Sequence, residues 1–125
     1  MTLLTVDEIV FLHTKLITKT GGLDGLRDKG LLESAVCSVN ASFFDVEKYP
    51  TIIEKSARLA YVIVNNHAFI DGNKRIGILV MIMTLKLNNI NIKYTQNELI
   101  DLGLDIASGK AGYKNIYEWI KQHLI

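Results

Sequence analysis

Hydrophobic positions recur along most of this chain at the three- and four-residue spacing of α-helices. The clearest helix starts are at Thr5 and Thr95, where a glutamate follows three residues later and completes a capping box. Glycine, asparagine and proline separate the periodic segments. The pattern predicts helices over residues 6–20, 29–39, 51–65, 73–87, 95–108 and 113–124.

Two of these helices are apolar enough to be central. The helix over 51–65 is apolar on most of its circumference, and residues 76–85 form the longest strongly apolar run. Six helices with short connections predict an all-α orthogonal bundle, one domain over residues 1–125. In the connection over 40–49, Phe43, Phe44 and Tyr49 are either rim packing or part of a groove for a partner, and we expect packing. Residues 90–94 should extend as an isolated segment, because no other segment looks ready to pair with it.

Composition excludes several classes of protein. The 14 Lys and Arg nearly balance 13 Asp and Glu, so no basic field favours direct nucleic-acid binding. The longest apolar run is about half the length that a bilayer requires, and the N-terminus lacks a signal peptide's basic region. The single cysteine, Cys37, is expected to be a small core residue. These features predict a protein of the reducing cytoplasm, without a membrane partner.

Residues 67–75, His-Ala-Phe-Ile-Asp-Gly-Asn-Lys-Arg, concentrate polar groups between the two central helices. Asp71-Gly72 is a turn signal, and the next helix is expected to begin at Asn73. The first turn of a helix offers unpaired N–H groups and the positive end of the macrodipole. Lys74 and Arg75 are unfavourable for the helix at that position, which indicates a ligand with several negative charges, such as a nucleotide polyphosphate.

Three more residues of this segment have separable uses. Asp71 is a candidate ligand for Mg²⁺, which proteins commonly bind through one or two carboxylates together with phosphates. His67 is a candidate general base toward a hydroxyl group, because its unperturbed pKa lies near neutrality. Phe69 is expected to fix the segment on the core. The residues alone leave open a purely structural interpretation, with two surface cations after an ordinary turn.

Two features outside this segment bear on it. His13 lies on the apolar face of the first helix, and we interpret it as a satisfied core or loop-bracing histidine rather than a catalytic one. Residues 22–28 are rich in glycine, but they lack the Lys-Ser/Thr ending of a P-loop and follow a helix rather than a strand. We expect Arg27 and Asp28 to tie this loop down.

The segment over 67–75 resembles the signature of the Fic/Doc superfamily, His-x-Phe-x-Asp/Glu-Gly/Ala-Asn with a basic tail, and specifically its death-on-curing (Doc) branch. Two further segments are similar to Doc proteins. These are Gly-Leu-Arg-Asp-Lys-Gly-Leu-Leu-Glu-Ser-Ala over 25–35 and Tyr-Pro-Thr over 49–51, ahead of an apolar helix. The resemblance therefore extends over most of the chain and implies a Fic fold, with the motif between two central helices.

The resemblance implies a toxin of a type II toxin–antitoxin system. Doc-like proteins act as protein Ser/Thr kinases that transfer the γ-phosphate of ATP to a threonine of elongation factor Tu, which inhibits translation. By this carry-over His67 is the base and Asp71 orients Mg²⁺ or the base. The residues expected to hold the phosphates are Gly72, Asn73, Lys74 and Arg75.

Two alternatives remain open. Fic enzymes transfer AMP from ATP to hydroxyl side chains, and this chain departs from their pattern at Ala68, where proline is usual, and at Lys74, where a second glycine is usual. A Fic-type AMP transferase with an unusual loop is one alternative. A catalytically inactive member that only binds a partner protein is the other.

The resemblance also bears on inhibition. Fic enzymes often carry an inhibitory Ser/Thr-x-x-x-Glu-Gly/Asn helix, but no glutamate of this chain has Ser or Thr four residues before it. We therefore expect a cognate antitoxin that binds in trans. Its disordered C-terminal segment should fold as an amphipathic helix into an apolar groove of this protein.

Overall fold

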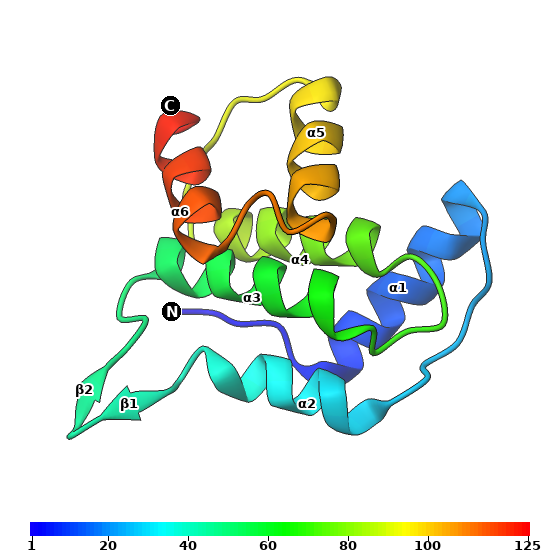
Figure 1. The fold of residues 1–125 in the computed structure, drawn as a ribbon, viewed down its shortest axis with the longest axis horizontal. Coiled ribbons are helices and arrows are strands. Elements are labelled where there is room, and N and C mark those ends of the chain that lie inside the picture. The colour runs from blue at the N-terminus through cyan, green and yellow to red at the C-terminus, as the bar shows by residue number, and fades with distance from the viewer.

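The helices follow one another in the order that the hydrophobic pattern predicts (Figure 1). The computed structural model describes residues 1–125. It contains the helices α1 (Val6–Thr20), α2 (Lys29–Ser38), α3 (Ile52–Asn66), α4 (Asn73–Leu87), α5 (Gln96–Ala107) and α6 (Tyr113–Gln122). The only strands are β1 (Ser42–Phe43) and β2 (Val46–Glu47), which form an antiparallel hairpin. The prediction of an all-α fold is confirmed.

Local hydrogen bonds explain why the helices start where they do. Thr5 and Glu8 form the predicted capping box, with the Thr5 N–H 2.9 Å from Glu8 Oε1 and the Glu8 N–H 3.1 Å from Thr5 Oγ1. The box at Thr95 is also confirmed. A third box at Thr51 sets the start of α3. Pro50, a residue type that suits the first turn of a helix, lies before Thr51 and therefore outside α3.

Helices α3 and α4 lie side by side at the centre, with α1 and α2 on one side and α5 and α6 on the other (Figure 1). Gly77 lets the two central helices approach closely, because a β-carbon there would stand 2.5 Å from Val64 Cγ2 and 3.3 Å from the Ala60 carbonyl oxygen. A glycine inside a helix costs about 1 kcal/mol relative to alanine, which this close packing offsets. The predicted central position of both helices is confirmed.

The expectations for residues 90–94 and for Cys37 were wrong. Residues 90–94 are paired: Ile92 forms a bridge with Leu124, and the Lys93 N–H donates to the His123 carbonyl oxygen at 2.9 Å. The last residues of the chain fold back after α6 to make this pairing.

Cys37 is exposed, because the buried face of α2 is set by other residues, and position 37 lies away from them. That face carries Leu32 and Ala35.

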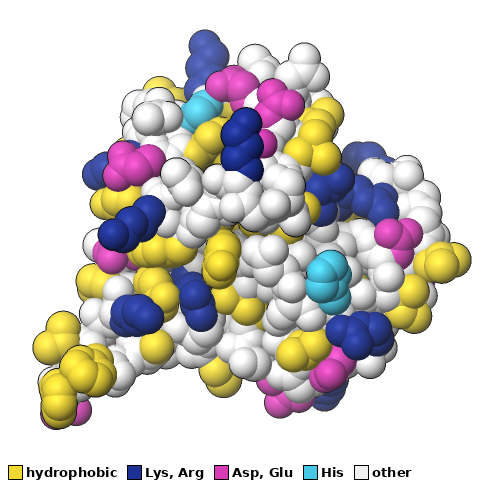
Figure 2. Space-filling model, in the orientation of Figure 1, with side chains coloured by type: hydrophobic (Ala, Val, Ile, Leu, Met, Phe, Trp, Pro, Cys, Tyr) yellow, Lys and Arg dark blue, Asp and Glu magenta, His cyan; other side chains and the backbone are white.

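The connection over 40–49 also differs from the expectation. Tyr49 is buried, but Phe43 and Phe44 are exposed rather than packed at the rim. Figure 2 shows the hydrophobic side chains gathered on the hairpin where it projects from the body of the molecule. Figure 1 places this hairpin at the opposite end of α3 from the connection to α4. No helix of the structure combines the length and apolar character needed to cross a membrane.

Candidate functional site

The motif loop, residues 67–72, connects the two central helices. His67 ends α3 in the left-handed conformation, with φ 55°, and Gly72 precedes α4 with φ 77°. The helix begins at Asn73, as the sequence predicts. Lys74 and Arg75 therefore lie in its first turn.

The amide of Asn73 closes the motif loop. Its Oδ1 accepts from the Phe69 N–H and its Nδ2 donates to the Phe69 carbonyl oxygen, both at 3.0 Å. The Phe69 side chain is buried in the core, which confirms that it fixes the loop there. Both polar atoms of the Asn73 side chain are bonded within the loop. The group of Asn73 that a ligand can bind is therefore the backbone N–H.

The glycine-rich loop, residues 21–28, runs alongside the motif loop. The Ile70 N–H donates to the Gly25 carbonyl oxygen at 3.0 Å, and the Arg27 N–H donates to the Ala68 carbonyl oxygen at 2.8 Å. Arg27 Nε donates to the His67 carbonyl oxygen at 2.8 Å. Asp28 accepts from the Leu31 N–H and so starts α2. These contacts confirm that Arg27 and Asp28 tie the loop down.

His13 braces the motif loop from α1. The side chain is buried, its Nε2 lies 2.7 Å from the Asp71 carbonyl oxygen, and its ring stacks on Phe69 with centroids 3.9 Å apart. This geometry confirms the interpretation of His13 as a satisfied, loop-bracing residue.

The Asp71 carboxylate is held by backbone donors on two sides. Oδ2 accepts from the Leu23 N–H at 3.0 Å, and Oδ1 accepts from the Gly72 N–H at 2.8 Å. These two bonds, with a smaller contribution from the Arg75 guanidinium 3.8 Å away, hold the pKa of Asp71 below its usual value. The carboxylate is therefore ionised at neutral pH and still partly exposed to solvent.

The surroundings of Asp71 fit a hard divalent cation that brings other ligands with it. No group of three or more His, Cys, Asp or Glu residues is arranged to hold a metal ion by itself. A cation at Asp71 would therefore have one carboxylate from the protein, and this is the ligand set in which Mg²⁺ is commonly found together with phosphate oxygens.

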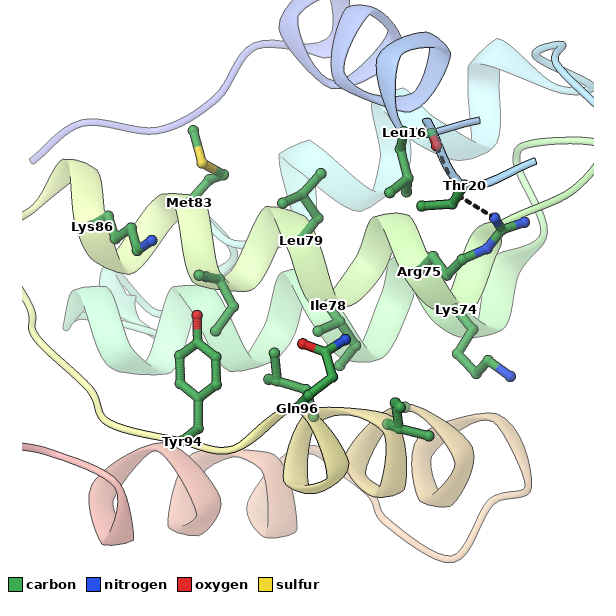
Figure 3. Close-up of a pocket in the computed structure, with 14 residues that line it drawn as sticks. Leu16, Thr20, Lys74, Arg75, Ile78, Leu79, Met83, Lys86, Tyr94 and Gln96 are labelled. Carbon is green, nitrogen blue, oxygen red and sulfur yellow. Dashed lines mark hydrogen bonds between the residues drawn. The ribbon is translucent and has the colours of Figure 1, made fainter. Parts of the chain in front are cut away.

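The two cations of the first turn point in different directions (Figure 3). Arg75 Nη1 donates to Thr20 Oγ1 at 2.6 Å and to the Gly21 carbonyl oxygen at 2.8 Å, so the guanidinium joins α4 to the end of α1. Lys74 is exposed, and its ammonium group makes no hydrogen bond or ion pair with the protein. The cation of the two that is free to meet a ligand is Lys74.

The first turn of α4 has no side-chain cap. Its first intrahelical bond runs from the Ile76 N–H to the Gly72 carbonyl oxygen, so the N–H groups of Asn73, Lys74 and Arg75 have no acceptor within the protein. Such a turn is suited to an anion, and the lysine beside it adds a full positive charge.

The imidazole of His67 is exposed at the edge of the motif loop. It makes no hydrogen bond with the protein, and the backbone of the residue is held through its carbonyl oxygen by Arg27. The side chain is therefore accessible to a group from another molecule, while its attachment point is fixed.

An apolar groove of about 490 Å³ begins at the same helix start. It runs along α4 between α1 and α5, with Lys74 and Arg75 at one end and Lys86 at the other (Figure 3). Its apolar lining includes Leu16, Ile78, Leu79, Ile82, Met83 and Ile100. We call it the α4 groove. The sequence predicts an apolar groove but not its location, because α1 builds it together with the much later helices α4 and α5.

Comparison with known proteins agrees with this geometry. The model of the Fic/DOC family matches residues 3–85, which span α1, the glycine-rich loop, the motif loop and most of α4. The chain belongs to the Fic/DOC family.

Two relatives carry the name Doc. The chain is 27% identical to protein kinase doc of Escherichia phage P1 over 116 residues, which are 93% of this chain and 90% of the phage protein. It is 44% identical to toxin Doc of Mycolicibacterium smegmatis over 55 residues, 44% of this chain and 42% of that protein. These similarities confirm that the chain is of the Doc branch.

Sequence reasoning about this Doc-family chain missed the role of two residues. Gly22 brings the glycine-rich loop against Asp71, and Thr20 binds Arg75. The repeated glycine after the first helix was a signal for such a close approach, since one glycine suffices to end a helix.

Proposed function

We propose that this Doc-family protein is a toxin and a protein kinase. It transfers the γ-phosphate of ATP to a hydroxyl side chain of a protein, a threonine of elongation factor Tu, and so inhibits translation. The similarity to protein kinase doc over nearly the whole chain supports this proposal. The observation that carries it is the uncapped first turn of α4 with the unpaired Lys74 ammonium in that turn.

His67 acts as the general base. Its exposed imidazole takes the proton of the target hydroxyl as that oxygen attacks the γ-phosphorus. The bond between the γ-phosphorus and the β–γ bridging oxygen breaks, and ADP leaves with that electron pair. The position at the edge of the loop suits a substrate that is itself a folded protein, since the acceptor hydroxyl must reach the base from outside.

The phosphates are bound by the start of α4. The free N–H groups of its first turn and the ammonium of Lys74 supply fixed positive charge where negative charge develops. Arg75 contributes through a guanidinium that is already positioned by Thr20 and Gly21, so little freedom is lost when a ligand binds. Asp71 would hold Mg²⁺, which when bound neutralises charge on the phosphate oxygens.

Lys74 favours phosphoryl transfer over AMP transfer. Fic enzymes that transfer AMP usually have glycine at this position, where backbone can approach the nucleotide closely. The lysine side chain fills that space and adds a charge, and its stem packs against α5, where a β-carbon on Gly103 would stand 3.1 Å from Lys74 Cγ. We infer that the polyphosphate is held with its γ end toward the base.

The proposal is tested by incubating the purified protein with elongation factor Tu, ATP and Mg²⁺ and measuring the intact mass of the factor. A gain of one phosphate on a threonine is expected. A gain of one AMP would support the Fic-type alternative instead. No gain on this factor, or on any protein of a cell extract labelled with γ-³²P ATP, would leave partner binding as the activity of the chain.

The α4 groove is proposed as the binding site of the cognate antitoxin of this toxin–antitoxin pair. Lys74 and Lys86 are separated by three turns and more of α4, about 18 Å at 1.5 Å per residue. An amphipathic helix of about 12 residues would match that length. It would bury its apolar face on the groove and place acidic residues near the lysines at both ends. Occupancy at the Lys74 end would compete with the phosphates.

A further inference from the structure

His13 contacts the motif loop at the backbone of Asp71, and the Asp71 carboxylate belongs to the proposed site. Its Nε2 lies 2.7 Å from the Asp71 carbonyl oxygen. Since a carbonyl oxygen only accepts, Nε2 carries the hydrogen and donates it. The imidazole is buried and stacks on Phe69 with an interplanar angle of 13°, so its orientation is fixed by core packing.

The peptide unit that joins Asp71 to Gly72 transmits this contact to the Asp71 carboxylate. The C=O and N–H of a trans peptide point in opposite directions within one rigid plane. The N–H of this same unit, which belongs to Gly72, donates to Asp71 Oδ1 at 2.8 Å. Holding the carbonyl toward His13 therefore holds the N–H toward the carboxylate.

This peptide unit has little else to keep it in place. Gly72 has φ 77° and no side chain, so the backbone there can adopt other conformations at low cost. If the unit rotated, its N–H would leave the carboxylate. The remaining backbone donor to Asp71 would then be the Leu23 N–H, on a different loop.

We propose that His13 is a positioning residue for the Asp71 carboxylate and acts through the peptide unit between residues 71 and 72. This inference rests on the proposed function in that Asp71 is given the Mg²⁺ site there. The opposite edge of the imidazole makes a longer contact, Nδ1 to Asp24 Oδ1 at 3.4 Å. Asp24 belongs to the glycine-rich loop and does not contact the motif loop through this interaction, which makes it a matched control.

Three variants separate positioning from packing. His13→Leu removes the donor and keeps a buried apolar side chain. His13→Gln keeps an N–H donor at the end of a side chain of similar reach. Asp24→Asn changes the group that faces Nδ1 of the ring and leaves the Nε2 donor to Asp71 unaltered.

The first measurement is amide hydrogen exchange by NMR, on the protein without nucleotide or metal. In His13→Leu the Gly72 amide should exchange about tenfold faster, as expected for the loss of one hydrogen bond of ordinary strength. The amides of the α3 and α4 cores should keep their protection. His13→Gln and Asp24→Asn should behave as the original protein does.

The second measurement is the Mg²⁺ concentration that gives half-maximal phosphoryl transfer. It should rise in His13→Leu and return toward the original value in His13→Gln. If the original protein transferred nothing, the proposed function would fail, while Gly72 exchange would still decide the positioning role. Unchanged Gly72 exchange in His13→Leu would overturn the proposal. So would equal acceleration throughout α1, α3 and α4, or a glutamine variant that behaves like the leucine variant.

Discussion

Gly22 and Asp71 lie so close together that a β-carbon on Gly22 would stand 2.5 Å from Asp71 Oδ2. The same β-carbon would stand 3.0 Å from Arg75 Nη2. The glycine-rich loop therefore packs backbone against the carboxylate, which is how the Leu23 N–H reaches it. A site on the motif loop depends in this way on a residue 49 positions earlier.

Gly22→Ala should displace Asp71 and lower the rate of phosphoryl transfer. Gly21→Ala is the matched control, because Gly21 also has a positive φ but has no atom within 4 Å of its added β-carbon. Backbone strain should cost both variants about 1–3 kcal/mol of stability. Only Gly22→Ala should also lose transfer at a temperature where both are folded. Equal activities in the two variants would show that the close approach to Asp71 is unimportant.

His67→Ala should lower the rate of transfer by about a hundredfold or more, the usual contribution of a general base. The protein should stay folded, because the imidazole is exposed and unbonded, and the left-handed backbone at this position should lower the melting temperature only slightly. His67 has φ 55°, a conformation that asparagine tolerates well. His67→Asn should therefore lose transfer equally without backbone strain. Full toxicity in either variant would contradict the assigned role.

Lys74→Gly should make phosphoryl transfer fall steeply, because it removes the unpaired cation at the start of α4 and opens space toward the nucleotide. Lys74→Ala separates loss of charge from the cost of a helical glycine, which is about 1 kcal/mol. Rates with ATP labelled at the α and at the γ position measure both kinds of transfer. An unchanged γ-transfer rate in both variants would mean that Lys74 is an ordinary surface charge.

Ile100→Asp should abolish binding of the antitoxin and leave the toxin folded. Ile100 lines the α4 groove, whereas Leu104, one turn further along α5, does not. Both side chains are 49% exposed, so Leu104→Asp is a matched control for the added charge.

Growth measures this binding. Expression of the chain alone should arrest growth, and expression with the adjoining gene should restore it. Rescue should fail with Ile100→Asp and persist with Leu104→Asp. Harmless expression of the active protein without a partner would oppose the toxin proposal.

The contact between Glu98 and His123, 2.6 Å from Oε2 to Nε2, should make stability depend on pH. Burial opposes protonation of His123 and so lowers its pKa. The hydrogen bonds that His123 makes to Glu98 and to the Trp119 carbonyl oxygen outweigh burial and raise the pKa above its usual 6.5. The hydrogen bond from His123 holds the pKa of Glu98 below 4.5.

The signs of these two shifts define the pH range. The contribution of His123 is complete below pH 6.5 and is lost as pH rises through its higher folded pKa. The contribution of Glu98 is complete above pH 4.5 and is lost as pH falls through its lower folded pKa. Urea unfolding across pH should therefore show the pair's full contribution between these values. His123→Gln should remove the loss of stability above pH 6.5, while Glu98 keeps its hydrogen bonds at Thr95 and part of the dependence at low pH. An identical pH profile in that variant would contradict the prediction.

The sequence by itself determined where the helices of this protein begin, to within a residue, whereas it placed the end of α6 two residues too late. The boxes at Thr5 and Thr95 are made by groups three residues apart, and the start of α4 follows from Asp71-Gly72. Such signals are local, because an N-cap or a turn satisfies backbone groups within a few residues of itself. Helical periodicity also predicts which face of each helix is buried, and the two most apolar segments of the chain are the two central helices.

Only the tertiary structure decided what the polar side chains of the motif bind. Phosphate binding by Asn73 and Arg75 stays a prediction, but their partners within the protein come from the fold: the Asn73 amide closes the loop, and Arg75 bonds to Thr20, 55 residues away. The pairing of Ile92 with Leu124 and the α4 groove have the same origin. A side chain's partner depends on which helices come to lie beside it, and that arrangement is set by packing of the whole core rather than by neighbouring residues.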